Sequence, residues 1–516
     1  MLRLTAFNMA SGNRIGWYIG FLSLLVANVL APAQATPWAD SDDLQVRHNL
    51  QILADAGVVN LSVSTYPLMW GALLEVLNDV DIRSLREHER NAYLQVMAVM
   101  NFHRQGGYTG GQISGQSNNG AERGFGQRQH EKGALEITQE LKSEHSAFRL
   151  QMAWRTGLET RFGRKDKQDL SFAGTYLATV VTTETFGSWV LSVDQLYTWW
   201  SPSYENDGMH TRSTRPLQSL RITRAGAAPS NLPILSWLGP WSATAYVGRS
   251  ERLIGVPDLL QQGDAELIAD AYANSTYLGS LVPGHREEAF GIRVTANPYK
   301  NLQLGARFTG SHLEGANAIS GRATPKNAAI DARFVVPSYL NLFDANGQLA
   351  LYGELITHQS SNDETFHTLG ADYSFAFGAN TQGSSNQGSR ITNARVYAEH
   401  LVHQQKETLA LGYSQFTNSG FGIDVRLRSI NYEPGYYQSM YFHEPHVQGM
   451  LADLVSQQRF GEFFAHTAKR QQADVSVYLP FRSGRLTAGV QAWEDTYRNN
   501  RNESDINLFL NWEIRW

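Results

Sequence analysis

The sequence contains no cysteine and few charged residues for its length, and each shortage excludes a class of protein. Without cysteine, the 516-residue chain has no disulfide framework, no thiolate zinc site and no cysteine nucleophile. Charged residues make up only 18% of the chain, and 43 Lys and Arg are outnumbered by 48 Asp and Glu. The formal net charge of -5 leaves no basic field for DNA or RNA, so no nucleic-acid partner is expected.

Long apolar runs are also missing after the first 35 residues. No later stretch approaches the roughly 18 apolar residues of a membrane-spanning helix, and the mean hydropathy of -0.34 is too polar for a bundle of such helices. At the N-terminus, two arginines and an apolar run from Ile15 to Leu30 precede Ala33-Gln34-Ala35. This order predicts a cleaved signal peptide over residues 1–35, with an uncleaved anchor helix as the alternative. The mature chain is then exported and starts at Thr36.

Residues 36–105 are predicted to form a small periplasmic helical bundle. Apolar residues at helical spacing indicate a first helix from Ser41 that stops at Gly57. A second helix fits Pro67 to Leu77, with Pro67 in its first turn, and a third fits Ile82 to Arg104. The Gly-, Ser-, Asn- and Gln-rich stretch from Gly106 to Gly120 then marks a boundary.

From residue 106 onward the apolar period changes from 3.6 to 2. Apolar and polar residues alternate in segments long enough to cross a bilayer as tilted strands, as from Phe148 to Trp154 and from Phe421 to Arg428. A soluble β-sandwich also alternates, but here the series from Ile506 runs to an aromatic last residue, Trp516. About 18 such strands can be counted, an even number, as in single-chain bacterial barrels. The sequence therefore predicts an all-β transmembrane barrel over residues 106–516.

The connections favour the same architecture, because short turns fall on one side and long loops on the other. The first strand is expected between Tyr108 and Gln129. The tight turns are Asn297–Lys300 and Phe481–Gly484, and the long loops are Ser201–Thr214, Ser250–Arg286, His312–Pro325 and Tyr432–Arg470.

Charged residues alternate with the lipid-facing apolar ones and should therefore point into the lumen, because a charge facing lipid is costly. Their mixed signs favour ion-pair networks that brace or obstruct the lumen, although a pore would use the same residues for selectivity. These residues are Arg149, Arg293, Arg307, Asp331, Arg333, Glu354, Arg395, Glu399, Asp424, Arg426 and Arg428.

Several stretches resemble the Wzi family of outer-membrane capsule-attachment proteins. Leu50 to Gly57 with Tyr66 to Trp70 resembles the family's N-terminal helical region, and Trp199-Trp200-Ser201-Pro202 with Arg215 to Arg221 resembles a strand, loop and strand. Trp237 to Trp241 and Tyr441-Phe442-His443 are similar to later segments. The resemblance implies an 18-stranded barrel with a periplasmic helical bundle and a lectin-like role in holding capsular polysaccharide. Separately, the series that ends at Trp516 resembles the C-terminal strand signal of bacterial outer-membrane barrels, which implies that the barrel-assembly machinery reads this strand.

The candidate sugar-binding residues are aromatic side chains, whose faces suit the C–H faces of pyranoses. For Trp199 and Trp200 an interfacial aromatic girdle is the alternative, and for the later tyrosines the alternative is packing within a loop. The candidates are Trp199, Trp200, Tyr204, Tyr432, Tyr436, Tyr437 and Tyr441.

No motif indicates catalysis, and neither a cofactor nor a metal is expected. His443-Glu444-Pro445-His446 lacks the spacing of a helical zinc motif, and no nucleophile elbow or phosphate loop occurs. We therefore predict a non-enzymatic outer-membrane protein, with outer-membrane lipid around it, that retains capsular or extracellular polysaccharide on the cell. A diffusion channel for small solutes or oligosaccharides is the main alternative, and a barrel hydrolase is a third possibility.

Overall fold

The computed structural model describes most of the barrel wall and the segments inside it. The described residues are 38–39, 43–103, 107–118, 121–127, 131–143, 146–158, 169–183, 187–207, 216–224, 229, 236–249, 287–313, 326–337, 347–359, 364–378, 392–403, 406–432, 467–497 and 501–516.

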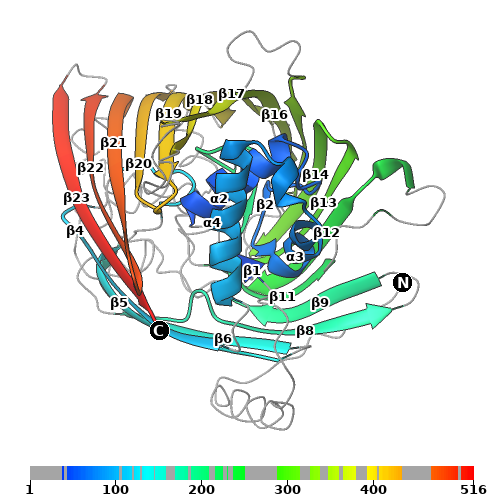
Figure 1. The fold of residues 1–516 in the computed structure, drawn as a ribbon. Coiled ribbons are helices and arrows are strands. Elements are labelled where there is room, and N and C mark those ends of the chain that lie inside the picture. Colours follow the sequence, from blue (N-terminus) through cyan, green and yellow to red (C-terminus); the bar gives the residue numbers. More distant parts are fainter. Residues whose placement is uncertain are drawn as a thin grey trace, which may run out of the picture.

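The wall is one closed barrel of antiparallel strands (Figure 1). Consecutive wall strands pair, and the last strand, β23 (Asn502–Arg515), closes the ring on the first, β4 (Gly107–Gln116). β7 (Asp169–Ser171) and β8 (Tyr176–Thr183) both pair with β6 (Ser146–Leu158), so they form one interrupted strand. Counted in this way the barrel has 18 strands, which confirms the predicted fold class.

The other wall strands follow in chain order. They are β5 (Glu131–Lys142), β9 (Gly187–Asp194), β11 (Gln218–Arg224), β12 (Trp241–Arg249), β13 (Glu287–Tyr299), β14 (Leu302–Leu313), β15 (Lys326–Val335), β16 (Gln348–Gln359), β17 (Glu364–Phe377), β18 (Thr392–His403), β19 (Lys406–Thr417), β20 (Gly422–Tyr432), β21 (Thr467–Phe481) and β22 (Gly484–Tyr497).

The outside of the wall is apolar and the inside is polar, the reverse of a water-soluble protein. Leu427 is 50% exposed and Leu411 is 55% exposed, whereas the neighbouring Arg426 and Arg428 are buried. In β23 the alternating apolar residues from Ile506 to Trp516 are on the outside, and the backbone of Trp516 bonds in both directions to Thr109 of β4. An outward apolar band of this kind is suited to lipid.

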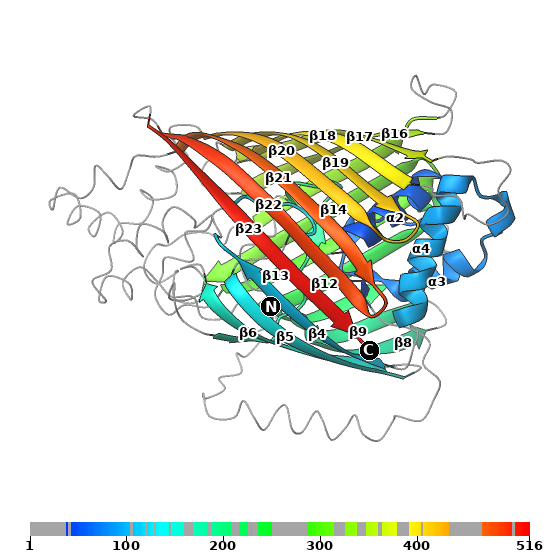
Figure 2. The same cartoon turned by 60° about the vertical axis from the view of Figure 1, so that its left-hand side comes forward.

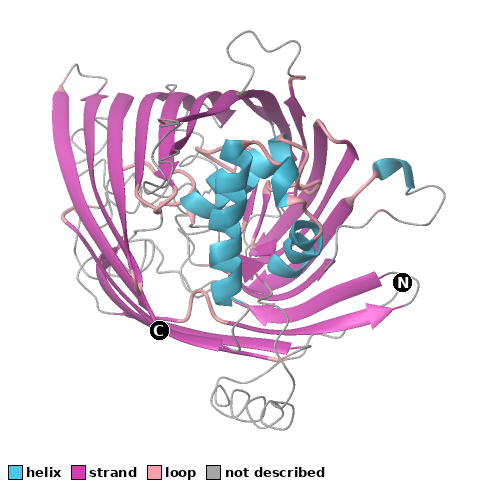
Figure 3. Ribbon diagram, viewed as in Figure 1, coloured by secondary structure: helices cyan, strands magenta, loops and turns pink. Residues whose placement is uncertain are grey.

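Three helices lie at one end of the barrel, and α2 (Leu44–Asp55) is buried there along nearly its whole length (Figures 2 and 3). The Asp43 carboxylate caps α2 by accepting a hydrogen bond from the Val46 amide at 3.0 Å, and Gly57 adopts a φ of 69° just after the helix. The others are α3 (Trp70–Asn78) and α4 (Glu87–His103), with 3₁₀ turns at Ile82–Ser84 and Ser236–Leu238. None of the described helices is long and apolar enough to cross a membrane.

Two helix boundaries differ from the prediction. Pro67 does not start α3, because it lies between two short strands, β2 (Thr65–Tyr66) and β3 (Leu68–Met69), that pair with other inner segments. The helix predicted from Ile82 to Arg104 is broken before Glu87, where the Glu89 carboxylate accepts the Arg86 amide at 2.9 Å and caps a new helix. The periplasmic location of residues 36–105 stays a prediction.

Short strands inside the barrel pair with one another and join the N-terminal segment to the loop that follows β9. β1 (Trp38–Ala39) pairs with β3, and β10 (Trp199–Trp200) pairs with β2. The loop after β10 was predicted to project from the barrel as part of Ser201–Thr214. That prediction is wrong for residues 201–207, where Ser201, Ser203 and Asp207 are buried, because the loop turns inward to bond with the wall.

A charge placed on the outer face should destabilise the barrel far more than an apolar replacement there. We expect Leu411→Arg on β19 to lower the free energy of unfolding by roughly 2–4 kcal/mol, because its side chain would enter lipid near the bilayer midplane. Leu411→Ile is the matched control, and reversible urea unfolding in lipid vesicles is the measurement. Equal stability of the two variants would contradict the outward orientation of Leu411.

Candidate functional site

Two loops fold into the lumen and form the centre of the candidate site. We call residues 121–127 and 195–207 the inner loops. They are joined by a backbone hydrogen bond from Phe125 to the Tyr204 carbonyl at 2.8 Å. Phe125 also packs edge to face against Trp199 and Tyr66, with ring centroids 5.4 and 5.0 Å apart. Such aromatic pairs are each worth about 0.5–1.5 kcal/mol beyond burial of their area, so the contact fixes the loops to β2.

The tryptophans of the second inner loop are buried inside the barrel. Trp199 is 2% exposed and Trp200 is 0% exposed, which excludes the interfacial girdle that was the alternative for them. The Trp199 indole donates to the carbonyls of Ser201 and Ser203, both at 3.2 Å. Tyr204 is also buried, and burial raises the pKa of its phenol. Sugar contact by these three residues stays a prediction.

The second inner loop is held by a carboxylate of the wall. Glu399 of β18 accepts hydrogen bonds from the Ser203 hydroxyl at 2.6 Å and from the backbone amides of Tyr204 and Glu205 at 2.6 and 3.2 Å. The Tyr352 hydroxyl donates to the same carboxylate at 2.8 Å. Four donors on one buried carboxyl group give its oxygens hydrogen-bond partners and fix the loop backbone.

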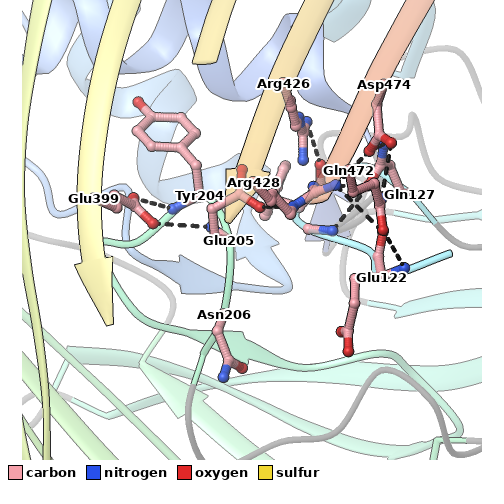
Figure 4. Close-up of polar contacts among 12 residues, drawn as sticks. Glu122, Gln127, Tyr204, Glu205, Asn206, Glu399, Arg426, Arg428, Gln472 and Asp474 are labelled. Carbon is pink, nitrogen blue, oxygen red and sulfur yellow. Dashed lines mark hydrogen bonds and ion pairs between the residues drawn. The ribbon is translucent and has the colours of Figure 1, made fainter. Parts of the chain in front are cut away.

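Both inner loops converge on the arginines of β20 (Figure 4). Arg428 forms ion pairs with Glu205 of the second loop and with Asp474 of β21, and donates to the Glu122 carbonyl at 3.3 Å. Arg426 donates to the Phe125 carbonyl at 2.8 Å. The first loop is thereby joined to β20 through its backbone.

The N-terminal helix is attached to the wall through the nearby strands β15, β17 and β18. Arg333 of β15 bonds to Asp55 of α2 at 2.7 and 2.9 Å, and to Asp372 of β17 at 2.7 and 2.9 Å. Arg395 of β18 bonds to the same Asp372 at 2.7 Å. The Arg47 guanidinium of α2 donates to the Ser203 carbonyl at 2.9 Å, so the helix also contacts the second inner loop.

All the charged residues predicted to face the lumen are buried, and most bond to an inner segment or to each other. Arg293 pairs with Asp331 at 2.8 Å and donates to the Trp200 carbonyl at 3.2 Å. Arg307 pairs with Glu354 at 2.5 Å, and Glu354 accepts the Ser201 hydroxyl at 2.9 Å. These buried residues are Arg149, Arg293, Arg307, Asp331, Arg333, Glu354, Arg395, Glu399, Asp424, Arg426 and Arg428.

A partly exposed group of charges and one aromatic ring lies at the end of the barrel away from the helices. We call Glu122, Lys406, Tyr432 and Arg470 the outer cluster. The Lys406 ammonium is 2.8 Å from the Glu122 carboxylate and 5.7 Å from the centre of the Tyr432 ring. The Tyr432 hydroxyl donates to Glu122 at 3.3 Å. Lys406 is the first residue of β19, and the last residue of that strand, Thr417, lies at the helices. There, Gln95 of α4 donates to the Thr417 carbonyl at 2.8 Å.

The electrostatics of the outer cluster favour an ionised acid at its centre. Burial disfavours the charged form of Glu122 and by itself would raise the pKa of its carboxyl. The positive charges of Lys406 and Arg470 have the larger combined effect and lower this pKa to about 2. Arg470 bonds in turn to Asp495 at 2.7 and 2.8 Å. The cluster therefore presents fixed charges of both signs beside an aromatic ring, a combination suited to polar ligands with apolar faces.

Of the predicted aromatic residues, the structure places Tyr432 in the outer cluster and Trp199, Trp200 and Tyr204 beneath it in the interior. Tyr436, Tyr437 and Tyr441 lie outside the described residues. Glu122, Lys406 and Glu205 were not predicted from the sequence. Lys406 could have been found from the alternation of β19, in which it takes an inward position. Glu122 and Glu205 lie in loops, which have no periodicity, so no sequence pattern indicates their partners. Within the described ranges, no three His, Cys, Asp or Glu side chains are grouped so as to hold a metal ion.

Comparison with known proteins gives a family model and a solved structure of the same fold. The family described as capsule assembly protein Wzi matches residues 101–313. The structure of Wzi from Escherichia coli, an outer-membrane protein involved in group 1 capsule assembly and a carbohydrate-binding β-barrel, is 18% identical. Its TM-score is 0.63 over 92% of this chain and 98% of that one.

Two further matches are more distant or partial. An uncharacterized 55.8 kDa protein in the cps region of Klebsiella pneumoniae is 25% identical over 295 residues, 57% of this chain and 49% of that protein. The chain thus spans about half the length of that relative. Pseudomonas aeruginosa OccK5 is 11% identical, covering 80% of this chain and 97% of that one, with a TM-score of 0.38. The family and fold matches confirm the resemblance noted in the sequence.

Removing the carboxylate of Asp55 should detach α2 from the wall. We expect Asp55→Ala to destabilise the protein by about 3–5 kcal/mol, because the buried Arg333 loses one of its two partners. The helical segment should become sensitive to added protease while the barrel stays assembled. Asp79→Ala, at an exposed position after α3, is the control and should leave protease resistance unchanged. Resistance equal to wild type in Asp55→Ala would contradict the role of this ion pair.

The outer cluster should weaken in acid. Because the pKa of Glu122 in the folded protein is about 2, below the ordinary value of 4.5, its stabilising contribution is present above pH 4.5 and is lost as the pH falls towards 2. Glu122→Gln lacks this contribution at every pH. The stability difference between wild type and Glu122→Gln, measured by urea unfolding at several pH values, should therefore shrink over that interval. A constant difference would contradict the ion pair with Lys406.

Proposed function

We propose that this chain, a Wzi-like outer-membrane β-barrel, binds a capsular or extracellular polysaccharide at the end away from its helices and so retains it on the cell surface. The single observation that carries this proposal is the outer cluster. A tyrosine ring, an ammonium and a carboxylate are held together there, partly exposed, at the barrel end opposite the helices. Pyranoses offer an apolar C–H face to such a ring and hydroxyls to the charged groups.

The rigid interior supports a binding role. The floor under the outer cluster consists of the inner loops, and these are fixed by the Glu399 and Arg428 contacts. A site whose parts are already ordered loses less conformational entropy when a ligand binds, so more of the contact energy appears as affinity. We propose that Trp199, Trp200 and Tyr204 act as this support and that Tyr432 is a direct contact. Tyr436, Tyr437 and Tyr441 are proposed as further contacts.

The main alternative is a wide diffusion channel that admits oligosaccharides. The inner loops and α2 cross the lumen and are bonded to the wall on several strands, which disfavours a path of that width. A non-enzymatic role is also part of the proposal, because the buried acids and arginines described here bond to one another and to backbone groups. A hydrolase would instead lose turnover of a glycan or lipid when a single Ser, His or Asp is replaced.

The test is the partition of polysaccharide between cells and culture supernatant at equal total synthesis. Deletion of the gene should move polysaccharide into the supernatant, and re-expression of the wild type should return it to the cells. Tyr432→Ala should weaken glycan binding by the purified barrel about two- to tenfold, as expected for loss of one aromatic contact.

The matched control is Tyr413→Ala, which removes a tyrosine from the same pair of strands outside the outer cluster. This variant should retain polysaccharide like the wild type. An unchanged partition after gene deletion would refute surface retention. Equal binding by Tyr432→Ala and the wild type would instead remove the outer cluster from the site.

A further inference from the structure

One side chain of the second inner loop is exposed inside the barrel. Asn206 is exposed, whereas the six other residues between 201 and 207 are all buried. Its two neighbours are among them, with Glu205 at 7% and Asp207 at 0% exposure. The loop is therefore packed against its surroundings everywhere except at this side chain, and a ligand in the lumen can contact the Asn206 amide.

The backbone on both sides of Asn206 is fixed. The Ser203 hydroxyl oxygen accepts hydrogen bonds from the backbone amides of Glu205 at 3.1 Å and of Asn206 at 3.2 Å. On the other side, the Asp207 carboxylate accepts the Trp200 amide at 3.3 Å. Because these contacts already order the loop, a ligand that binds to Asn206 does not have to order it.

The side chains of Asn206 and Glu122 leave the two inner loops on the same side (Figure 4). The strand beside them, β18, runs toward that side, and its last residue pairs with Lys406 of the outer cluster. Arg428 joins the two loops, because it forms an ion pair with Glu205 and donates to the Glu122 carbonyl. Asn206 therefore faces the same end of the barrel as the outer cluster and is held by the same arginine.

The two side chains offer complementary hydrogen-bonding groups. An ionised Glu122 only accepts hydrogen bonds, whereas the Asn206 carboxamide has two N–H donors and an acceptor oxygen. Sugar hydroxyls both donate and accept, so they can bond to either group. Asn206 thus supplies donors that the Glu122 carboxylate lacks.

Among the described residues around this side of the inner loops, each lysine or arginine already faces an acid. The pairs are Lys406 with Glu122, Arg470 with Asp495, Arg428 with Glu205 and Asp474, and Arg307 with Glu354. A carboxylate or phosphate of a ligand would have to compete with these acids, and the ionised Glu122 would repel it. An uncharged sugar can bond through its hydroxyls without displacing any of them.

We propose that Asn206 is a direct contact of the polysaccharide and that the sugar residue bound to it is uncharged. This inference rests on the proposed function and extends its site from the outer cluster onto the second inner loop. Tyr432 and Lys406 then contact one part of the bound chain, and Asn206 bonds to hydroxyls of another part. Acidic sugars of the polysaccharide lie outside the contact with Asn206.

The test is titration calorimetry of the purified barrel with extracellular polysaccharide from the strain that carries the gene. Asn206→Ala removes the carboxamide but keeps the backbone amide that bonds to Ser203, so the loop should keep its path. We expect this variant to bind about two- to tenfold more weakly than the wild type, as for loss of one hydrogen bond. The matched control is Asn78→Ala, which removes an exposed carboxamide at the helix end and should bind like the wild type.

Asn206→Lys tests the charge of the bound sugar. This variant should bind more weakly than the wild type, because a cation gains no attraction from an uncharged sugar and lacks the acceptor oxygen. The ratio of the two affinities should be the same in about 50 and 500 mM NaCl, since salt screens only interactions between charges. All variants should show the heat-dependent gel mobility of an assembled barrel.

Two results would overturn the inference. Equal binding by Asn206→Ala and the wild type would remove Asn206 from the site, and tighter binding by Asn206→Lys in low salt would show an acidic sugar at this position. If Tyr432→Ala still weakens binding in the same experiment, the function proposed above stands without Asn206. A wild-type barrel that binds no polysaccharide would instead refute that function, and this inference with it.

Discussion

The structure depends on ion pairs that buried arginines of the wall form with carboxylates of the wall and of the segments inside the barrel. Arg333 is the clearest case, since it bonds to Asp55 of α2 and to Asp372 of the wall at the same time. Removing a charge from water is costly, and only good geometry with several hydrogen bonds repays that cost. Neither the wall nor α2 can therefore move away without leaving a buried charge unpaired. This constraint makes the interior a fixed part of the barrel.

The same constraint extends from α2 to the surface away from the helices. Arg47 of α2 bonds to the second inner loop, that loop bonds to Arg428 through Glu205, and Arg428 bonds to the backbone of Glu122. Glu122 is the acid at the centre of the outer cluster. A continuous series of contacts thus joins the helix end to the proposed polysaccharide site.

Much of the wall could be predicted because its signal is local. Alternation along a strand indicates which of its faces meets lipid. A charge in lipid and an apolar side chain in water are both unfavourable, and each effect depends on the single residue concerned. That pattern predicts an outward Leu427 and an inward Arg428, and in the structure Leu427 is half exposed whereas Arg428 is buried. The strand count and the aromatic end at Trp516 predicted a barrel, and the structure shows that β23 closes it on β4. The helix breaks near Pro67 and Glu87 were missed, because pairing with distant segments overrode the local periodicity.

The sequence by itself determined the class of the fold, the orientation of the strands and the absence of thiol chemistry, since composition and a period of two residues are properties of single segments. Only the tertiary structure decided what fills the lumen. A loop has no periodicity, so nothing local distinguishes the inward path of residues 201–207 from an outward one. Its path is set by Glu399, Arg428 and other partners far away in sequence. The outer cluster likewise arises from pairings between residues far apart in sequence.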